Sequence, residues 1–81
     1  MSERLKFVGR LEEAKLLRQE LHMRIDGLVK ALRENLDPFE DDIGDIPADM
    51  IAQQALELAK LRLDYIEVSE KMRAIEKALG K

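Results

Sequence analysis

Apolar residues recur through residues 3–35 at gaps that alternate between four and three positions. This series, the first seam, consists of Phe7, Leu11, Ala14, Leu21, Ile25, Leu28 and Leu32, with Arg18 at the one position that breaks it. Gaps that average about 3.5 residues are typical of a helix whose apolar side faces a second helix. The stretch contains no proline. It predicts a helix over about residues 3–35, roughly 45 to 50 Å long.

A second and more regular repeat runs through residues 46–79. This second seam consists of Ile51, Gln54, Leu58, Leu61, Tyr65, Val68, Met72, Ile75 and Leu79, and Gln54 is its only uncharged polar amide. Its gaps alternate between three and four throughout, so we predict a second helix over about residues 46–79.

The connection between the two helices is predicted to be an acidic loop over about residues 36–45. Pro38 should end the first helix, because proline cannot donate to the preceding turn. Asp37 and Pro38 together resemble the start of a short helical turn, and Gly44 permits a reversal of the chain. We expect Asp45 to cap the second helix.

Two helices of similar length joined by a short loop must lie antiparallel. Residue i of the first helix then faces about residue 83 minus i of the second, which sets Arg18 opposite Tyr65, where the guanidinium can lie on the ring. The sequence therefore predicts an all-α fold, an antiparallel, coiled-coil-like two-helix hairpin that forms a single domain over residues 1–81.

The second helix also carries an apolar series outside its seam, and we name this series the α-stripe. Its members are Ala52, Leu56, Ala59, Leu63 and Ile66. They lie about 150° around the helix from the seam, so one partner helix cannot cover both. We expect a second copy of the chain to cover the stripe, giving a homodimer that is a four-helix bundle. Docking of the stripe on a different protein is the alternative.

Composition and charge narrow the classes of function. The chain has no Cys, so it has no disulfide framework and no thiolate ligand for a metal. Its first ten residues do not form a secretory signal and no apolar run is long enough to span a bilayer, so we expect a cytoplasmic protein that binds no membrane. Residues 37–45 hold five acids and no base. The candidate partner-facing tip of the hairpin is Phe39, Glu40, Asp41 and Asp42.

The residues offer little for catalysis, and we expect no enzyme, no metal site and no cofactor. His22 is the only histidine, and a local ion pair with Asp26 is its expected role. The acidic loop lacks the glycine and the final glutamate that an EF-hand places at fixed positions. Nucleic acid is a disfavoured partner, because the basic residues spiral around the first helix and the isoelectric point is about 5.2.

These observations predict a non-catalytic, oligomerising protein that acts as an adaptor or accessory subunit for another macromolecule. Two alternatives stay open. One is a small helical nucleic-acid-associated regulator, in which association gathers the scattered Lys and Arg residues. The other is a ligand-binding helical bundle that uses Arg18, Gln54, Tyr65 or the acids of the loop.

Overall fold

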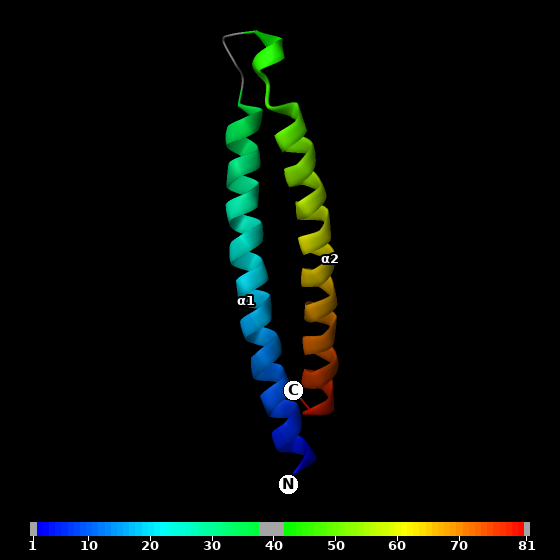
Figure 1. Cartoon of the computed structure of the whole chain (residues 1–81). Helices are drawn as coiled ribbons and strands as arrows, with labels where there is room; N and C mark the ends of the chain where they lie inside the picture. Colours follow the sequence, from blue (N-terminus) through cyan, green and yellow to red (C-terminus); the bar gives the residue numbers. More distant parts are fainter. Residues whose placement is uncertain (1, 38–41, 81) are drawn as a thin grey trace.

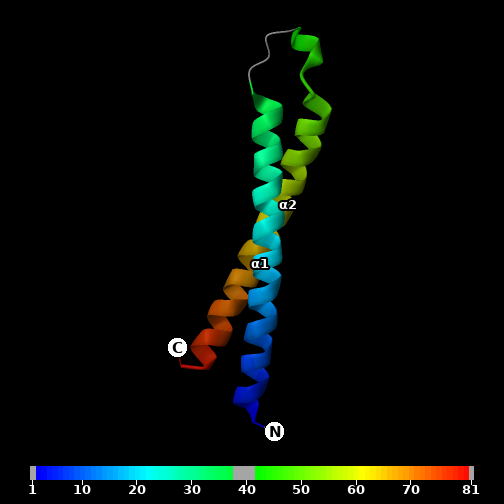
Figure 2. The same ribbon diagram turned by 90° about the vertical axis from the view of Figure 1, so that its left-hand side faces the viewer.

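The computed structural model describes residues 2–37 and 42–80, and in these ranges the chain forms two long helices. Helix α1 spans Glu3–Leu36, a short 3-10 helix η1 spans Ile43–Asp45, and α2 spans Ala48–Ala78. The helices run antiparallel along a body of 64 × 18 × 14 Å (Figure 1). Seen from the side, they cross near the middle of their length (Figure 2). The predicted all-α helical hairpin is confirmed.

The ends of the helices follow from local hydrogen bonding. The Ser2 side chain accepts from the backbone N–H of Arg4, which caps the first turn of α1. At the other end of the hairpin, Gly80 adopts a φ of +76°, a left-handed conformation that glycine adopts without strain and that commonly ends a helix.

The start of α2 differs from the prediction, since Asp45 does not cap this helix. Asp45 belongs to η1, which is capped by the Asp42 carboxylate accepting from the Gly44 N–H at 3.1 Å. Ile46 is extended, as expected of a residue that precedes a proline, and it separates Asp45 from the helix. Pro47 occupies the cap position of α2 without a side-chain hydrogen bond. The helical turn that we expected to start at Asp37 and Pro38 falls on residues 38–41, which lie outside the described residues.

The core of the hairpin consists of residues from the two seams alone. Among residues 2–37 and 42–80, the eight buried hydrophobic residues are Leu11, Ala14, Leu21, Leu61, Val68, Met72, Ile75 and Leu79. The predicted register is also confirmed. Arg18 Nε donates to the Tyr65 hydroxyl at 3.0 Å, and the guanidinium carbon lies 5.1 Å from the centre of the Tyr65 ring. The one charged residue in the first seam is therefore held by a hydrogen bond and a cation–π contact.

Burial divides the hairpin into two parts, the stem and the tip. The stem, residues 2–23 and 60–80, contains all eight buried residues. The tip, residues 24–37 and 42–59, has seam residues that are only partly buried, namely Ile25, Leu28, Leu32, Ile51, Gln54 and Leu58. In the tip, Asn35 Nδ2 donates to Gln54 Oε1 at 2.8 Å, so the polar position of the second seam is paired within the hairpin.

Candidate functional site

The α-stripe lies on the side of α2 that faces away from α1, and its side chains are exposed. Leu56 is 63% exposed, Leu63 is 61% exposed and Ile66 is 36% exposed. Ala52 and Ala59, between and beside them, are exposed as well. The five residues follow one another at gaps of four and three, so they form one continuous apolar line of roughly 21 Å along the helix.

Exposed apolar residues on α1 do not form such a line. Leu5, Leu16 and Met23 are as exposed as the leucines of the stripe. They are separated by eleven and seven positions, however, and charged residues including Glu12 and Glu13 lie between them. Single apolar residues on a surface are ordinary, whereas a continuous apolar patch marks an interaction surface. The stripe on α2 is therefore the stronger candidate.

Small side chains border the α-stripe on one side. Ala48 and Ala55 are exposed and lie along one edge of the stripe when the residues are placed around the helix at 3.6 per turn. The distance between two packed helices depends on the side chains at their contact. Alanines at this edge permit another helix to approach α2 closely.

Of the four residues predicted to face a partner at the end of the hairpin, only Asp42 is described. Phe39, Glu40 and Asp41 lie outside the described residues. Asp42 is exposed and its carboxylate is engaged by the Gly44 N–H. Within residues 2–37 and 42–80, no three His, Cys, Asp or Glu side chains are grouped so that they could hold a metal ion.

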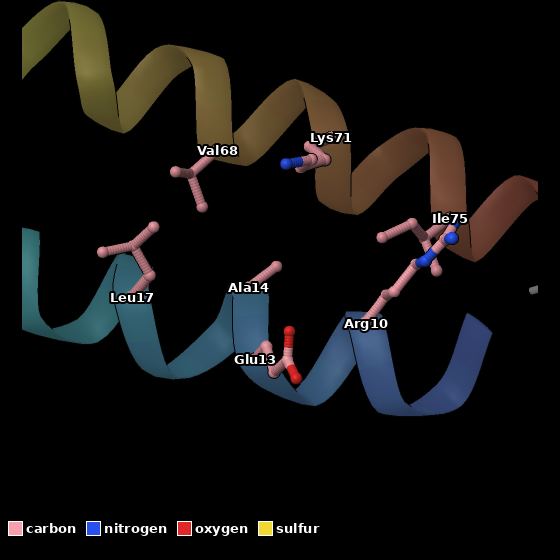
Figure 3. Close-up of a pocket in the computed structure, with 7 residues that line it drawn as sticks. All are labelled: Arg10, Glu13, Ala14, Leu17, Val68, Lys71 and Ile75. Atoms are coloured by element: carbon pink, nitrogen blue, oxygen red, sulfur yellow. The ribbon is translucent and has the colours of Figure 1, made fainter. Parts of the chain in front are cut away.

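A shallow pocket of about 400 Å³ opens between the helices where the small side chain of Ala14 leaves space. Figure 3 shows Arg10, Glu13 and Lys71 around it, with Ala14, Leu17, Val68 and Ile75 forming the remaining walls. Binding sites for small molecules are mostly apolar, with a few polar groups that converge on the ligand. The charges that line it are of both signs, two bases and one acid, so they do not converge on one kind of charged ligand.

Two further hollows lie on either side of the Arg18 and Tyr65 pair. His22 lines one of them together with Lys15 and Gln19, and no carboxylate lines that hollow. The expected ion pair between His22 and Asp26 is not formed, because the Asp26 carboxylate pairs instead with Lys30 at 3.1 Å. Lysine reaches the carboxylate one turn away along the helix, which is the favourable spacing for an ion pair.

Sequence reasoning passed over Ser69, which lines the hollow on the other side of Tyr65. Its hydroxyl is buried and, among the described residues, has no hydrogen-bond partner. A serine hydroxyl in a helix can turn towards the carbonyl four residues before it. His22 does not line this hollow, so Ser69 lacks the neighbouring histidine that most often activates a serine nucleophile.

In the described part of the chain, neither helix combines the length and apolar character needed to cross a membrane. Comparison of the chain with protein-family models, with curated proteins and with solved structures finds no match to any of them. The surface features of the hairpin are therefore the basis for a functional proposal.

Proposed function

We propose that this protein is a non-catalytic interaction protein that associates with itself through the α-stripe. Two hairpins join with their α2 helices at the centre and their α1 helices outside, forming a four-helix assembly in which the helices pack side by side. The resulting dimer serves as an adaptor or accessory subunit. The observation that carries the proposal is the continuous exposed apolar line on α2, which the described residues of the hairpin leave uncovered.

The magnitude of the hydrophobic contribution explains why association needs more than the stripe. Complete burial of a leucine side chain contributes about 1.5 to 3 kcal/mol, so Leu56 and Leu63 of two copies, each about three-fifths exposed, contribute roughly 4 to 7 kcal/mol together. The loss of translational and rotational freedom opposes this with about 4 to 15 kcal/mol. Further contacts along α2 are needed for a stable dimer.

The three polar groups of the seams that the ligand-binding alternative would use are engaged inside the hairpin. Arg18 and Tyr65 bond to each other, and Gln54 bonds to Asn35. A ligand would have to displace these contacts, and each is a hydrogen bond whose loss leaves a partly buried group unpaired. This favours the interaction protein over the ligand-binding bundle.

The proposal is tested by placing charge in the stripe and measuring the mass in solution. The test variant is Leu56→Lys with Leu63→Lys, and the matched control is Leu5→Lys with Leu16→Lys on α1. The two pairs are exposed to almost the same extent, 63% and 61% against 62% and 63%, and they change the net charge equally. Light scattering over a concentration series is expected to find a dimer for the parent chain and for the control, and a monomer for the test variant.

Helicity by circular dichroism should be unchanged in both variants, because all four leucines lie outside the seams. A parent chain that stays monomeric at every concentration would contradict the proposal. So would a test variant that dimerises as the parent does, since the stripe would then not be the interface.

A further inference from the structure

The charges of the hairpin are separated along its long axis. Between Arg33 and Lys60 the chain has eight acidic residues and no basic residue. The rest of the chain holds all 14 Lys and Arg residues, so it is basic on balance. The hairpin places the six described acids of this segment, Glu34, Asp37, Asp42, Asp45, Asp49 and Glu57, in the tip, and the larger share of the basic residues in the stem (Figure 1).

The exposed charges beyond the two ends of the α-stripe have no ion-pair partner within the described residues. Asp42, Asp45 and Asp49 lie beyond the tip end of the α-stripe, and Arg73 and Lys77 lie beyond its stem end. All five are exposed, and the ion pairs of the described hairpin involve other residues. The stripe thus has an unpaired acidic region at one end and an unpaired basic region at the other.

A dimer based on the stripe must extend into these regions. The stripe is roughly 21 Å long. A stable and specific protein interface buries about 1,200 to 2,000 Å² in total, more than a single helix contact of this length provides. The relative direction of the two hairpins then decides which charges meet.

We infer that the second copy lies antiparallel to the first, so that the acidic tip of each hairpin rests on the basic stem of the other. This inference rests on the proposed function and specifies its geometry. With the two-fold axis at Ala59, the centre of the stripe, residue j faces about residue 118 minus j of the partner. Ala52 then faces Ile66, and the segment at Asp45 lies alongside Arg73. A parallel pair would instead place like charges opposite each other at both ends, which opposes association.

Charge determines the direction of this contact more than its strength. Exposed ion pairs are individually weak and are screened by salt, with a Debye length of about 8 Å at physiological ionic strength. An antiparallel dimer is therefore expected to weaken, by roughly threefold to thirtyfold in Kd, between low and high salt. A parallel dimer would tighten, because salt would screen its repulsion.

The decisive experiment uses the absence of cysteine from the chain, since each introduced thiol has no other partner. Two variants, Ala52→Cys and Ile66→Cys, place a thiol at either end of the stripe. Disulfides form only when the two Cα atoms approach within about 7 Å. Equal amounts of the two variants are mixed under mild oxidation, and the crosslinked species are identified by their mass.

The antiparallel dimer predicts that the mixed disulfide dominates and that each variant alone crosslinks at least tenfold more slowly. Rapid crosslinking of each variant with itself would overturn the antiparallel direction while leaving the stripe as the interface. A dimer by light scattering with no crosslink of either kind would overturn both the stripe and the direction. A monomer would overturn the proposed function and this inference with it.

A single charge reversal gives an independent readout. Glu70 is the acid that lies on the line of the stripe within the stem, and it is exposed. In the antiparallel dimer Glu70→Lys places a base near the partner's Asp49, so dimerisation should tighten by about threefold. In a parallel dimer a facing pair of lysines would replace a facing pair of glutamates, so the repulsion would remain and dimerisation would not tighten.

Discussion

The stem and the tip of the hairpin continue the same two seams but bury them to different extents. Every fully buried side chain belongs to the stem, while the seam residues of the tip are partly exposed. In the stem Leu11 is only 2% exposed, whereas Leu28 in the tip contacts the core from its edge. A regular apolar repeat therefore does not ensure equal packing along two helices.

The two parts differ in charge as well. The tip contains the described acids of the segment between Arg33 and Lys60, and the stem holds most of the basic residues. The α-stripe begins in the tip and ends in the stem. Self-association along it would add contacts to the part of the hairpin that its own fold packs least, and this links the uneven core to the proposed interface.

The largest expected effect is the loss of stability when a seam leucine of the stem is truncated. We compare it with the same truncation in the tip. Leu11→Ala should lower the free energy of unfolding by about 3 kcal/mol, because it removes a fully buried side chain and leaves a cavity. Leu28→Ala should cost about 1 kcal/mol, because a partly exposed site loses less burial and can fill with water. Urea unfolding followed by circular dichroism at one protein concentration measures both.

The protein concentration must be held fixed in this comparison, since binding of a second copy shifts the apparent stability. Equal losses for the two variants would show that the tip is packed as tightly as the stem in solution. That result would remove the distinction between the two parts.

The fold was largely predictable from the sequence because two regular repeats and one proline-containing loop leave a single simple arrangement. The residue pairing of the helices followed from their lengths alone, and the Arg18 contact with Tyr65 confirms it. The start of α2 was not predictable in detail. Asp45, Pro47 and Gly44 each suit more than one kind of turn, and the extended residue before Pro47 decided among them.

The candidate site was predictable in its position on α2 and less so in its local ion pairs. The exposed stripe on α2 follows from periodicity, because a helix with one partner must leave its far side open. Asp26 has two candidate partners four positions away, His22 and Lys30, and the ion pair that the spacing predicts with Lys30 is the one that forms. The acidic end of the hairpin was predictable as well, since residues 37–45 hold five acids and no base and join the two predicted helices.

The contact between Arg18 and Tyr65 lies in the stem near the middle of the molecule, and it gives the second largest expected effect. Tyr65→Phe removes the hydroxyl that accepts from Arg18 Nε at 3.0 Å, while it keeps the ring under the guanidinium. The loss of one hydrogen bond to a charged donor in a partly buried site should cost about 1 kcal/mol. Urea unfolding of the variant measures this cost.

The control for this prediction is Tyr65→Leu, which also removes the ring and should cost more. If Tyr65→Phe unfolds at the same urea concentration as the parent, the hydroxyl is bonded equally well to water. The seam position of Arg18 would then be held by the ring alone.

The smallest expected effect is the gain in stability when a glycine inside α1 is replaced by alanine. The stem and the tip each contain one such glycine. Gly9 in the stem and Gly27 in the tip both lie inside the helix, and an added Cβ at either would meet no atom within 4 Å. Replacing a helical glycine with alanine stabilises by about 0.5 to 1 kcal/mol, because the unfolded chain loses conformational freedom. Gly9→Ala and Gly27→Ala should each raise the unfolding midpoint. Amide hydrogen exchange should in addition slow most around Gly27, because the tip opens more readily than the stem.

These two substitutions also test which helix faces solvent in the assembled protein. The proposed dimer joins α2 helices and leaves the outer side of α1 uncovered, so both alanines should be tolerated at every protein concentration. If Gly27→Ala destabilises the protein only at concentrations where it is dimeric, a second chain must approach the α1 backbone closely at that point. The interface would then involve α1 of the tip, and the assignment of the α-stripe as the contact surface would have to be withdrawn.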